Sequence, residues 1–184
     1  MSMHCSLNEE DRAVIRGNLD VIGQAQKLLE SLSDTTYSQK KADGFTSTIG
    51  QHMRHALDVY VALKQGEACG DIDADRRRRG HLVEHDRQMA RKEWQWLAEW
   101  LQSLSHQQLH RPVHISTQVT LYSTNTVCLS TTVMRELIVV ASHATHHFAM
   151  IRSAAYELGE VLDEHIGVAA ATASYERDQL RCAR

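Results

Sequence analysis

The most strongly patterned part of the sequence is Ser142-His143-Ala144-Thr145-His146-His147-Phe148-Ala149-Met150-Ile151. On a helix, His143 and His147 lie one turn apart on the same face, so both imidazoles can reach a single point. Val140 and Ile151 continue this line, and the pair therefore faces an apolar interior, where an unpartnered imidazole would be costly. Histidines at this spacing on the buried side of a helix commonly provide two nitrogen ligands to a metal. The stretch thus predicts a helix that carries part of a metal site.

Four amphipathic segments divide most of the chain, at about residues 8–33, 47–65, 81–104 and 131–158. In each segment apolar residues recur at steps of three and four, which is typical of helices that bury one face. Residues 34–46 are polar and predict a connection, while residues from about 160 onward show no strong periodicity. Residues 109–130 alternate and are rich in β-branched side chains, which predicts a short β-hairpin or two extended segments. We therefore expect an all-α fold with this insertion between the third and fourth helices, in one domain over residues 1–184.

The composition is ordinary for a globular protein except for its histidines. Hydrophobic residues make up 42% of the 184 residues, and 20 basic against 23 acidic residues give a net charge of −3, which argues against a general nucleic-acid binder. No apolar run approaches the roughly 18 residues of a transmembrane helix, and the N-terminus shows no signal-peptide pattern, so we expect a cytoplasmic protein. The cysteines are far apart and predict reduced thiols rather than a disulfide framework: Cys5, Cys69, Cys128 and Cys182. The 12 histidines are unusually many and direct attention to metal binding.

The second helical segment offers a third nitrogen ligand. His52 lies inside its apolar arc and His55 lies at the edge of that arc. Either imidazole could project toward the pair on the last helix, and spacing alone slightly favours His52. His85 has polar neighbours, which favours a solvated position, and His146 points away from the pair. The residues alone leave the choice between His52 and His55 open.

Two carboxylates could support such a site. Glu136 lies two turns before the histidine pair on the same line, and Asp58 lies in the second helical segment. Each could orient a ligand imidazole or transfer a proton. Alternatively, each could form an ion pair with a neighbouring arginine, Arg135 or Arg54.

A basic run, Arg76-Arg77-Arg78-Arg79, would by itself suggest contact with nucleic acid. However, three aspartates precede it, at Asp71, Asp73 and Asp75. Charges of opposite sign at a helix start are the commoner explanation of such a pattern. We therefore expect no nucleic-acid partner.

Three segments together resemble the DinB/YfiT-like superfamily of small metal-binding four-helix bundles. They are residues 45–58 (FTSTIGQHMRHALD), residues 135–137 (REL) with 142–152 (SHATHHFAMIR), and residues 167–172 (GVAAAT). The order and length of the elements match over nearly the whole chain. The resemblance implies an up-down-down-up four-helix bundle that holds a divalent metal, often nickel or zinc, with three histidines.

The resemblance also assigns the ligands. Two come from the last helix, at His143 and His147. The ligand from the second helix is usually followed by a small or apolar pair and then aspartate, as in His55-Ala56-Leu57-Asp58. The family pattern therefore favours His55, with His52 as the alternative ligand or as a hydrogen-bonding neighbour.

For function, the resemblance implies a metal-dependent enzyme acting on a small molecule. Characterised relatives include transferases and isomerases that use low-molecular-weight thiols such as bacillithiol or mycothiol. Three nitrogen ligands leave an open position, which favours catalysis over a structural metal. A metal-dependent hydrolase, a non-catalytic metal-binding or stress-related protein with a structural or sensing metal, and an interaction protein with core histidines are the alternatives. We expect no membrane partner and a homodimer, in which the three tryptophans of the third helix could cover an apolar patch.

Overall fold

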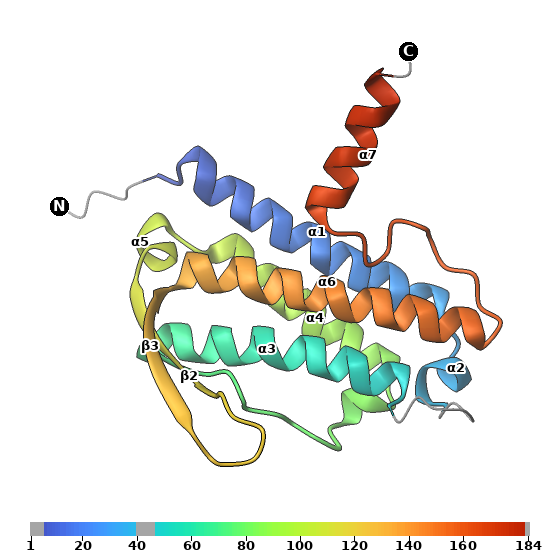
Figure 1. Ribbon diagram of the computed structural model, residues 1–184, viewed down its shortest axis with the longest axis horizontal. Coiled ribbons are helices and arrows are strands. Elements are labelled where there is room, and N and C mark those ends of the chain that lie inside the picture. The colour runs from blue at the N-terminus through green and yellow to red at the C-terminus, as the bar shows by residue number, and fades with distance from the viewer. Residues whose placement is uncertain (1–5, 40–46, 183–184) are drawn as a thin grey trace.

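The computed structural model describes residues 6–39 and 47–182 of the chain (Figure 1). The four long helices are α1 (Glu9–Ser31), α3 (Ile49–Cys69), α4 (Arg87–Ser103) and α6 (Val133–Glu157). The shorter helices are α2 (Asp34–Ser38), the 3-10 helix η1 (Leu82–Glu84), α5 (His106–Leu109) and α7 (Ala170–Cys182). One sheet is formed by β1 (Asp71–Asp73), β2 (Pro112–Gln118) and β3 (Thr126–Thr132). The protein is thus mostly helical with a small sheet, as the sequence predicts.

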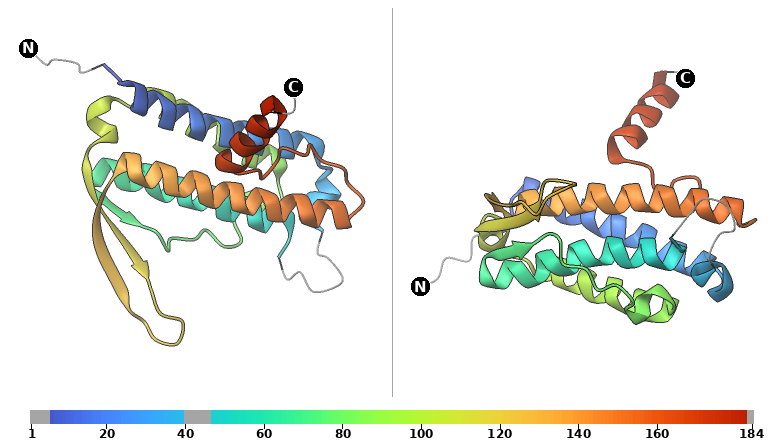
Figure 2. Two further views of the ribbon diagram at one scale, coloured as in Figure 1. Left: turned by 45° about the horizontal axis from the view of Figure 1, so that its top comes forward. Right: turned by 60° about the horizontal axis from the view of Figure 1, so that its bottom comes forward.

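Each of the four long helices packs against two of the others. Helix α1 packs on α4 and α6, and α3 packs on the same two helices. Helices α1 and α6 run in one direction, while α3 and α4 run in the opposite direction (Figure 1). Apolar residues of all four helices belong to one buried cluster. The two views in Figure 2 show the same arrangement.

The core consists of the apolar stripes that the sequence pattern predicts, together with aromatic side chains between them. Trp94 of α4 is fully buried and contacts the rings of Tyr60 and Phe148 edge to face, at centroid distances of 5.4 and 6.0 Å. Its indole N–H donates to Sδ of Met53 at 3.1 Å. The hydroxyl of Tyr60 donates to Oδ1 of Asn18 at 2.7 Å, so the polar atoms of these buried rings are satisfied.

Helix α3 is longer than predicted. The predicted segment ends at about residue 65, just before Gly66, but Gly66 lies inside the helix, and the left-handed residue at the end is Gly70, with φ of 93°. A β-carbon at Gly66 would lie only 2.6 Å from the carbonyl oxygen of Asp71. Glycine is therefore required at position 66 so that β1 can approach the helix closely, rather than for a helix stop.

Two other predicted boundaries are wrong. Residues 34–38, predicted as connection, form the short helix α2, because Ser33 caps it by accepting a hydrogen bond from the N–H of Thr36. The remainder of that connection, residues 40–46, lies outside the described residues, as does Cys5. The third long helix begins at Arg87 with Asp86 as its N-cap, so Leu82 does not share its apolar face and is exposed.

The predicted hairpin is confirmed, since β2 and β3 pair antiparallel from Pro112 opposite Thr132 to Gln118 opposite Thr126. Strand β1 adds a parallel edge to β2 and was not predicted. With three residues it is too short to show a period of its own. The basic run that follows β1 lies in the irregular segment before η1, so the expectation that these charges mark a helix start is wrong.

The surface differs from the expectation at α4 and α7. Of the three tryptophans in α4, Trp94 and Trp100 are buried, and only Trp96 is exposed, to 43%. The ammonium of Lys64 lies 4.6 Å from the ring centroid of Trp96. Helix α7 contains no buried residue and projects away from the long helices (Figures 1 and 2). Within residues 6–39 and 47–182, none of the helices has the length and apolar character needed to cross a membrane.

Candidate metal centre

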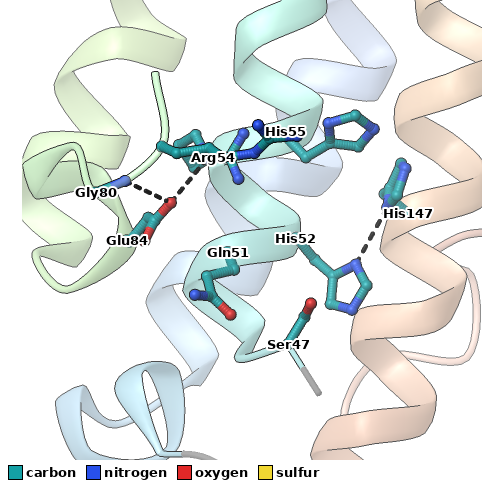
Figure 3. A pocket seen from close by; sticks show the side chains of 9 residues that line it. Ser47, Gln51, His52, Arg54, His55, Gly80, Glu84 and His147 are labelled. Atoms are coloured by element: carbon teal, nitrogen blue, oxygen red, sulfur yellow. Dashed lines mark hydrogen bonds and ion pairs between the residues drawn. The ribbon is translucent and has the colours of Figure 1, made fainter. Parts of the chain in front are cut away.

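The predicted site lies between α3 and α6. Helix α3 is fixed at its start by a capping box, in which Thr48 and Gln51 bond each other's backbone N–H. Gly50 lets η1 approach the first turn, because a β-carbon there would overlap the backbone of Glu84. This anchored first turn sets the rotation of α3 about its axis, and His55 one turn later faces α6 (Figure 3).

His55, His143 and His147, here called the histidine triad, meet at one point. One ring nitrogen from each lies within 4.8 Å of the others. Nε2 of His143 is 3.1 Å from Nε2 of His55, and the three ring centroids are 4.5 to 4.9 Å apart. Ligand nitrogens at about 2.0–2.1 Å from a tetrahedral metal would be roughly 3.3 Å apart. Small side-chain rotations are therefore enough to bind a metal.

The environment keeps these imidazoles neutral. Partial burial, with a contribution from the neighbouring imidazoles, lowers the pKa of His147 to about 3. Burial and then the charge of Arg77 lower the pKa of His55 to about 4, and the same two causes lower the pKa of His143. A metal binds the neutral imidazole, so the triad is in its ligand form near pH 7. Three neutral nitrogen donors suit nickel, zinc, copper or iron.

His52, the alternative ligand, lies beside the triad. Its Nδ1 is 3.2 Å from Nδ1 of His147, so that one of these two nitrogens donates to the other (Figure 3). This contact leaves Nε2 of His147 available for the triad centre. His52 is buried, and burial lowers its pKa. The position suits a residue that fixes the ring of a ligand histidine.

The two candidate carboxylates bond to arginines. Asp58 is buried and accepts hydrogen bonds from Arg54 at 2.9 Å and from the side chain and backbone N–H of Arg78 at 2.7 and 3.0 Å. Glu136 is also buried and accepts from Thr131 and Arg135, both at 2.7 Å. The charge of Asp58 opposes the lowering of the pKa of His55. Both carboxylates therefore lie in ion pairs, and Asp58 also acts electrostatically on the triad.

A cavity of about 430 Å³ adjoins two of the triad histidines. It is lined by Ser47, Gln51, His52, Arg54, His55, Arg79, Gly80, Glu84 and His147 (Figure 3). Glu84 accepts from Arg54 and from the N–H of Gly80, so this wall is held by internal bonds. Arg79 also lines the cavity and is exposed, so its positive charge can attract an anionic group.

The basic run contributes more to the site than the sequence suggests. Arg78 forms a bidentate ion pair with Glu93, at 2.8 and 3.0 Å, besides its bonds to Asp58. Arg77 is partly buried, and its charge acts on His55 and His143. In the sequence, the basic run marks Arg77 and Arg78 as notable residues. It does not predict their contacts, because these depend on how the segment before η1 folds.

The other candidates lie elsewhere. His85 and His146 are exposed, although the ring of His146 is 5.6 Å from that of His147. Cysteines within residues 6–39 and 47–182 are unpaired and exposed, at Cys69, Cys128 and Cys182. None of these side chains belongs to the histidine triad.

Comparisons with protein-family models, with curated proteins and with solved structures found no match. The DinB/YfiT-like resemblance therefore stays a prediction from the sequence motifs. Independently of this resemblance, the structure brings His55, His143 and His147 together.

Proposed function

We propose that the protein is a DinB-like metal-dependent enzyme, an up-down-down-up four-helix bundle whose histidine triad holds nickel or zinc. The proposed reaction is conjugation of a low-molecular-weight thiol to a small electrophile: the thiolate sulfur forms the new bond, and the leaving group of the electrophile departs. The observation that carries this proposal is the meeting of three neutral imidazoles from α3 and α6 beside a cavity of small-molecule size.

The ligand count together with the adjoining cavity supports catalysis. Structural zinc sites usually close with four protein ligands, whereas the triad comprises three. A divalent metal at this position would lower the pKa of a bound water or thiol and supply a nucleophile near neutral pH. His55 and His147 line the cavity, so a substrate there would be next to a metal held by the triad.

The surrounding residues supply orientation and charge. His52 holds the ring of His147 through the Nδ1 contact. Arg77 disfavours a proton on the nearby imidazoles and favours an anion at the open position. A thiolate and a metal-bound hydroxide are both anions, so this charge supports either ionised nucleophile over a neutral ligand. Asp58 acts through Arg54, whose side chain forms part of the cavity wall.

The test is a thiol-transfer assay on tag-free protein loaded with nickel or zinc. The wild type should conjugate a thiol such as bacillithiol or mycothiol to a chromogenic electrophile, and His147→Ala should lose at least about 100-fold in rate. His85→Ala is the matched control, because this histidine is exposed and lies outside the histidine triad, and its rate should not change. Ester hydrolysis without thiol would identify a hydrolase instead. A metal-loaded protein inactive in both assays would contradict catalysis and leave a structural or sensing metal.

We further propose a homodimer in the cytoplasm, now with α7 rather than the tryptophans as the contacting element. Helix α7 buries no residue of its own and exposes Tyr175 and Leu180. Removing residues 169–184 should convert a dimer to a monomer in analytical ultracentrifugation. A wild type that sediments as a monomer at high concentration would exclude this assembly.

A further inference from the structure

A second cluster of metal-ligating side chains lies away from the triad, where α5 meets the start of α1 (Figure 1). It consists of Asp11 from the first turn of α1, His106 from α5 and His110, the C-cap of α5, and is called the Asp11 cluster below. One ligand atom from each residue lies within 4.8 Å of the others. Neither the sequence motifs nor the proposed enzyme accounts for it.

The carboxylate of Asp11 is the fixed point of this cluster. Its side chain is inaccessible to solvent, and its Oδ2 accepts from the backbone N–H of Asn8 at 2.9 Å in a capping box. Although burial opposes it, hydrogen bonds from His106, Asn8 and His110 lower the pKa of Asp11 to about 2. The group is therefore an anion at every physiological pH, held in one orientation by the helix start.

The two imidazoles close over this anion. Nδ1 of His106 is 2.7 Å from Oδ2, and Nε2 of His110 is 2.8 Å from Oδ1. The rings lie side by side, with centroids 4.3 Å apart, because the residues are four positions apart across one helical turn. A capping box between Ser105 and Gln108 fixes that turn. The backbone thus sets the positions of all three ligand groups.

Charge and access both suit a cation here. Among the described residues, the ion-pair partners of Asp11 are His106 and His110, with no lysine or arginine. A buried carboxylate needs a compensating charge, and a divalent cation between Asp11 and the two imidazoles would supply it. The side chains of His106 and His110 are 28% and 43% exposed, so an ion can enter without unfolding.

We propose that the Asp11 cluster is a second divalent-metal site, which takes zinc or another late first-row transition metal. Two imidazole nitrogens and one carboxylate oxygen form a common ligand set for these ions, and water completes the coordination at the exposed side. On binding, the ring nitrogens that face Asp11 give up their protons, either to the other ring nitrogen or to solvent. The bound metal ties the start of α1 to α5 and so stabilises this edge of the fold.

The site is tested apart from the triad. Tag-free protein carrying His55→Ala, His143→Ala and His147→Ala is freed of metal with a chelator and titrated with Co²⁺, followed by its visible absorption. This variant should bind about one ion per chain, and adding His110→Ala should weaken binding by more than about tenfold. The melting temperature should rise with Co²⁺ in the first variant and stay constant in the second.

His114→Ala is the matched control. His114 is an exposed histidine 3.7 Å from Asp71, a histidine–aspartate pair outside both clusters, so its loss should leave Co²⁺ binding unchanged. If the triple variant does not fold, the same comparison is made in the wild type, where His110→Ala should lower binding from about two ions to about one. No Co²⁺ binding by the folded triple variant, or equal binding with and without His110, would overturn the proposal.

Discussion

The two histidine clusters of this protein use the same side chain in opposite electrostatic surroundings. In the triad, three imidazoles face one another between α3 and α6, with the positive charge of Arg77 nearby. In the Asp11 cluster, two imidazoles face a buried anion at the molecular edge. The first arrangement excludes protons from its histidines, and the second stabilises a negative charge.

Each cluster is therefore suited to a different task. Neutral imidazoles without a carboxylate leave most of the charge on a bound metal, which is useful for activating a substrate. A carboxylate that is already bonded to both imidazoles stabilises the fold even without metal. Removing a ligand should therefore abolish metal binding at the triad, whereas at the Asp11 cluster it should also destabilise the protein.

The largest effect on stability is expected where a buried carboxylate beside the triad is removed. Asp58→Ala leaves Arg54 and Arg78 without one of their partners and should lower the free energy of unfolding by about 3 kcal/mol. Urea denaturation of the metal-free protein measures this change. Asp20→Ala, at an exposed position of α1, is the control and should change stability by less than about 0.5 kcal/mol.

Asp11→Ala should have the next largest effect. It removes one half of the capping box of α1 and the acceptor of two histidines, which together should cost about 2 kcal/mol in the metal-free protein. Asp11→Asn keeps an acceptor for the N–H of Asn8 and should cost less. In contrast, His143→Ala should change the stability of the metal-free protein by under about 1 kcal/mol. Equal losses for Asp11→Ala and His143→Ala would remove the distinction between the clusters.

Acid should destabilise the two clusters in different pH ranges. The folded-state pKa values of His55 and His147, about 4 and 3, lie below the unfolded value of about 6.5. Between pH 6.5 and 4 the unfolded chain binds more protons, so the free energy of unfolding falls as the pH falls. The pKa of Asp11 is about 2 in the folded protein, against an ordinary value of 3.8. Its contribution to the free energy of unfolding is therefore lost only below about pH 4.

The pH range can be assigned by substitution. In metal-free protein, His147→Gln should reduce the stability lost between pH 7 and 4.5 by about 1 kcal/mol, a figure discounted for partial exposure. Asp11→Asn should leave that range unchanged and reduce the loss below pH 4. Chemical denaturation at a series of pH values measures both. A His147→Gln profile that parallels the wild type would mean that this imidazole does not resist protonation.

The smallest effect concerns Arg77. Arg77→Gln should raise the pKa of His55 and His143, since its charge disfavours their protonated forms. At pH 7 the metal affinity of the triad should change by less than about threefold, because the charge acts through a partly solvated medium. Imidazole titration by NMR follows the pKa values. Arg76→Gln, at an exposed residue of the same run, should leave them unchanged.

The long helices and the hairpin could be predicted because their apolar patterns extend over several periods. Strand β1 and helix α2 could not, since three and five residues are too few to show a period. The end of α3 lies beyond the predicted residue 65, because Gly66 allows the close approach of β1 and does not end the helix. Local pattern thus predicts the long helices that bury an apolar face. The short elements depend on tertiary contacts, and α7, which buries no residue, shows no such pattern.

The candidate site shows the same limit. The pair on α6 is visible in the sequence because the apolar stripe around it shows which face is buried. The choice between His52 and His55 depends on the rotation of α3 against α6, which spacing alone does not determine. The spacing of His106 and His110 equals that of the pair on α6, yet no apolar stripe marks it, and its carboxylate lies 95 positions from His106 in the chain.

The central claim, that the triad holds a metal, is tested most directly by the metal content of tag-free protein measured by plasma mass spectrometry. After the Asp11 cluster is removed with His110→Ala, we expect about one nickel or zinc per chain, and none when His55→Ala or His143→Ala is added. The variant with His52→Ala should keep most of its metal, because His52 bonds to His147 beside the triad centre. Retention of metal without His55 and its loss without His52 would move the third ligand to His52. Absence of metal from every preparation, even after reconstitution, would contradict the account.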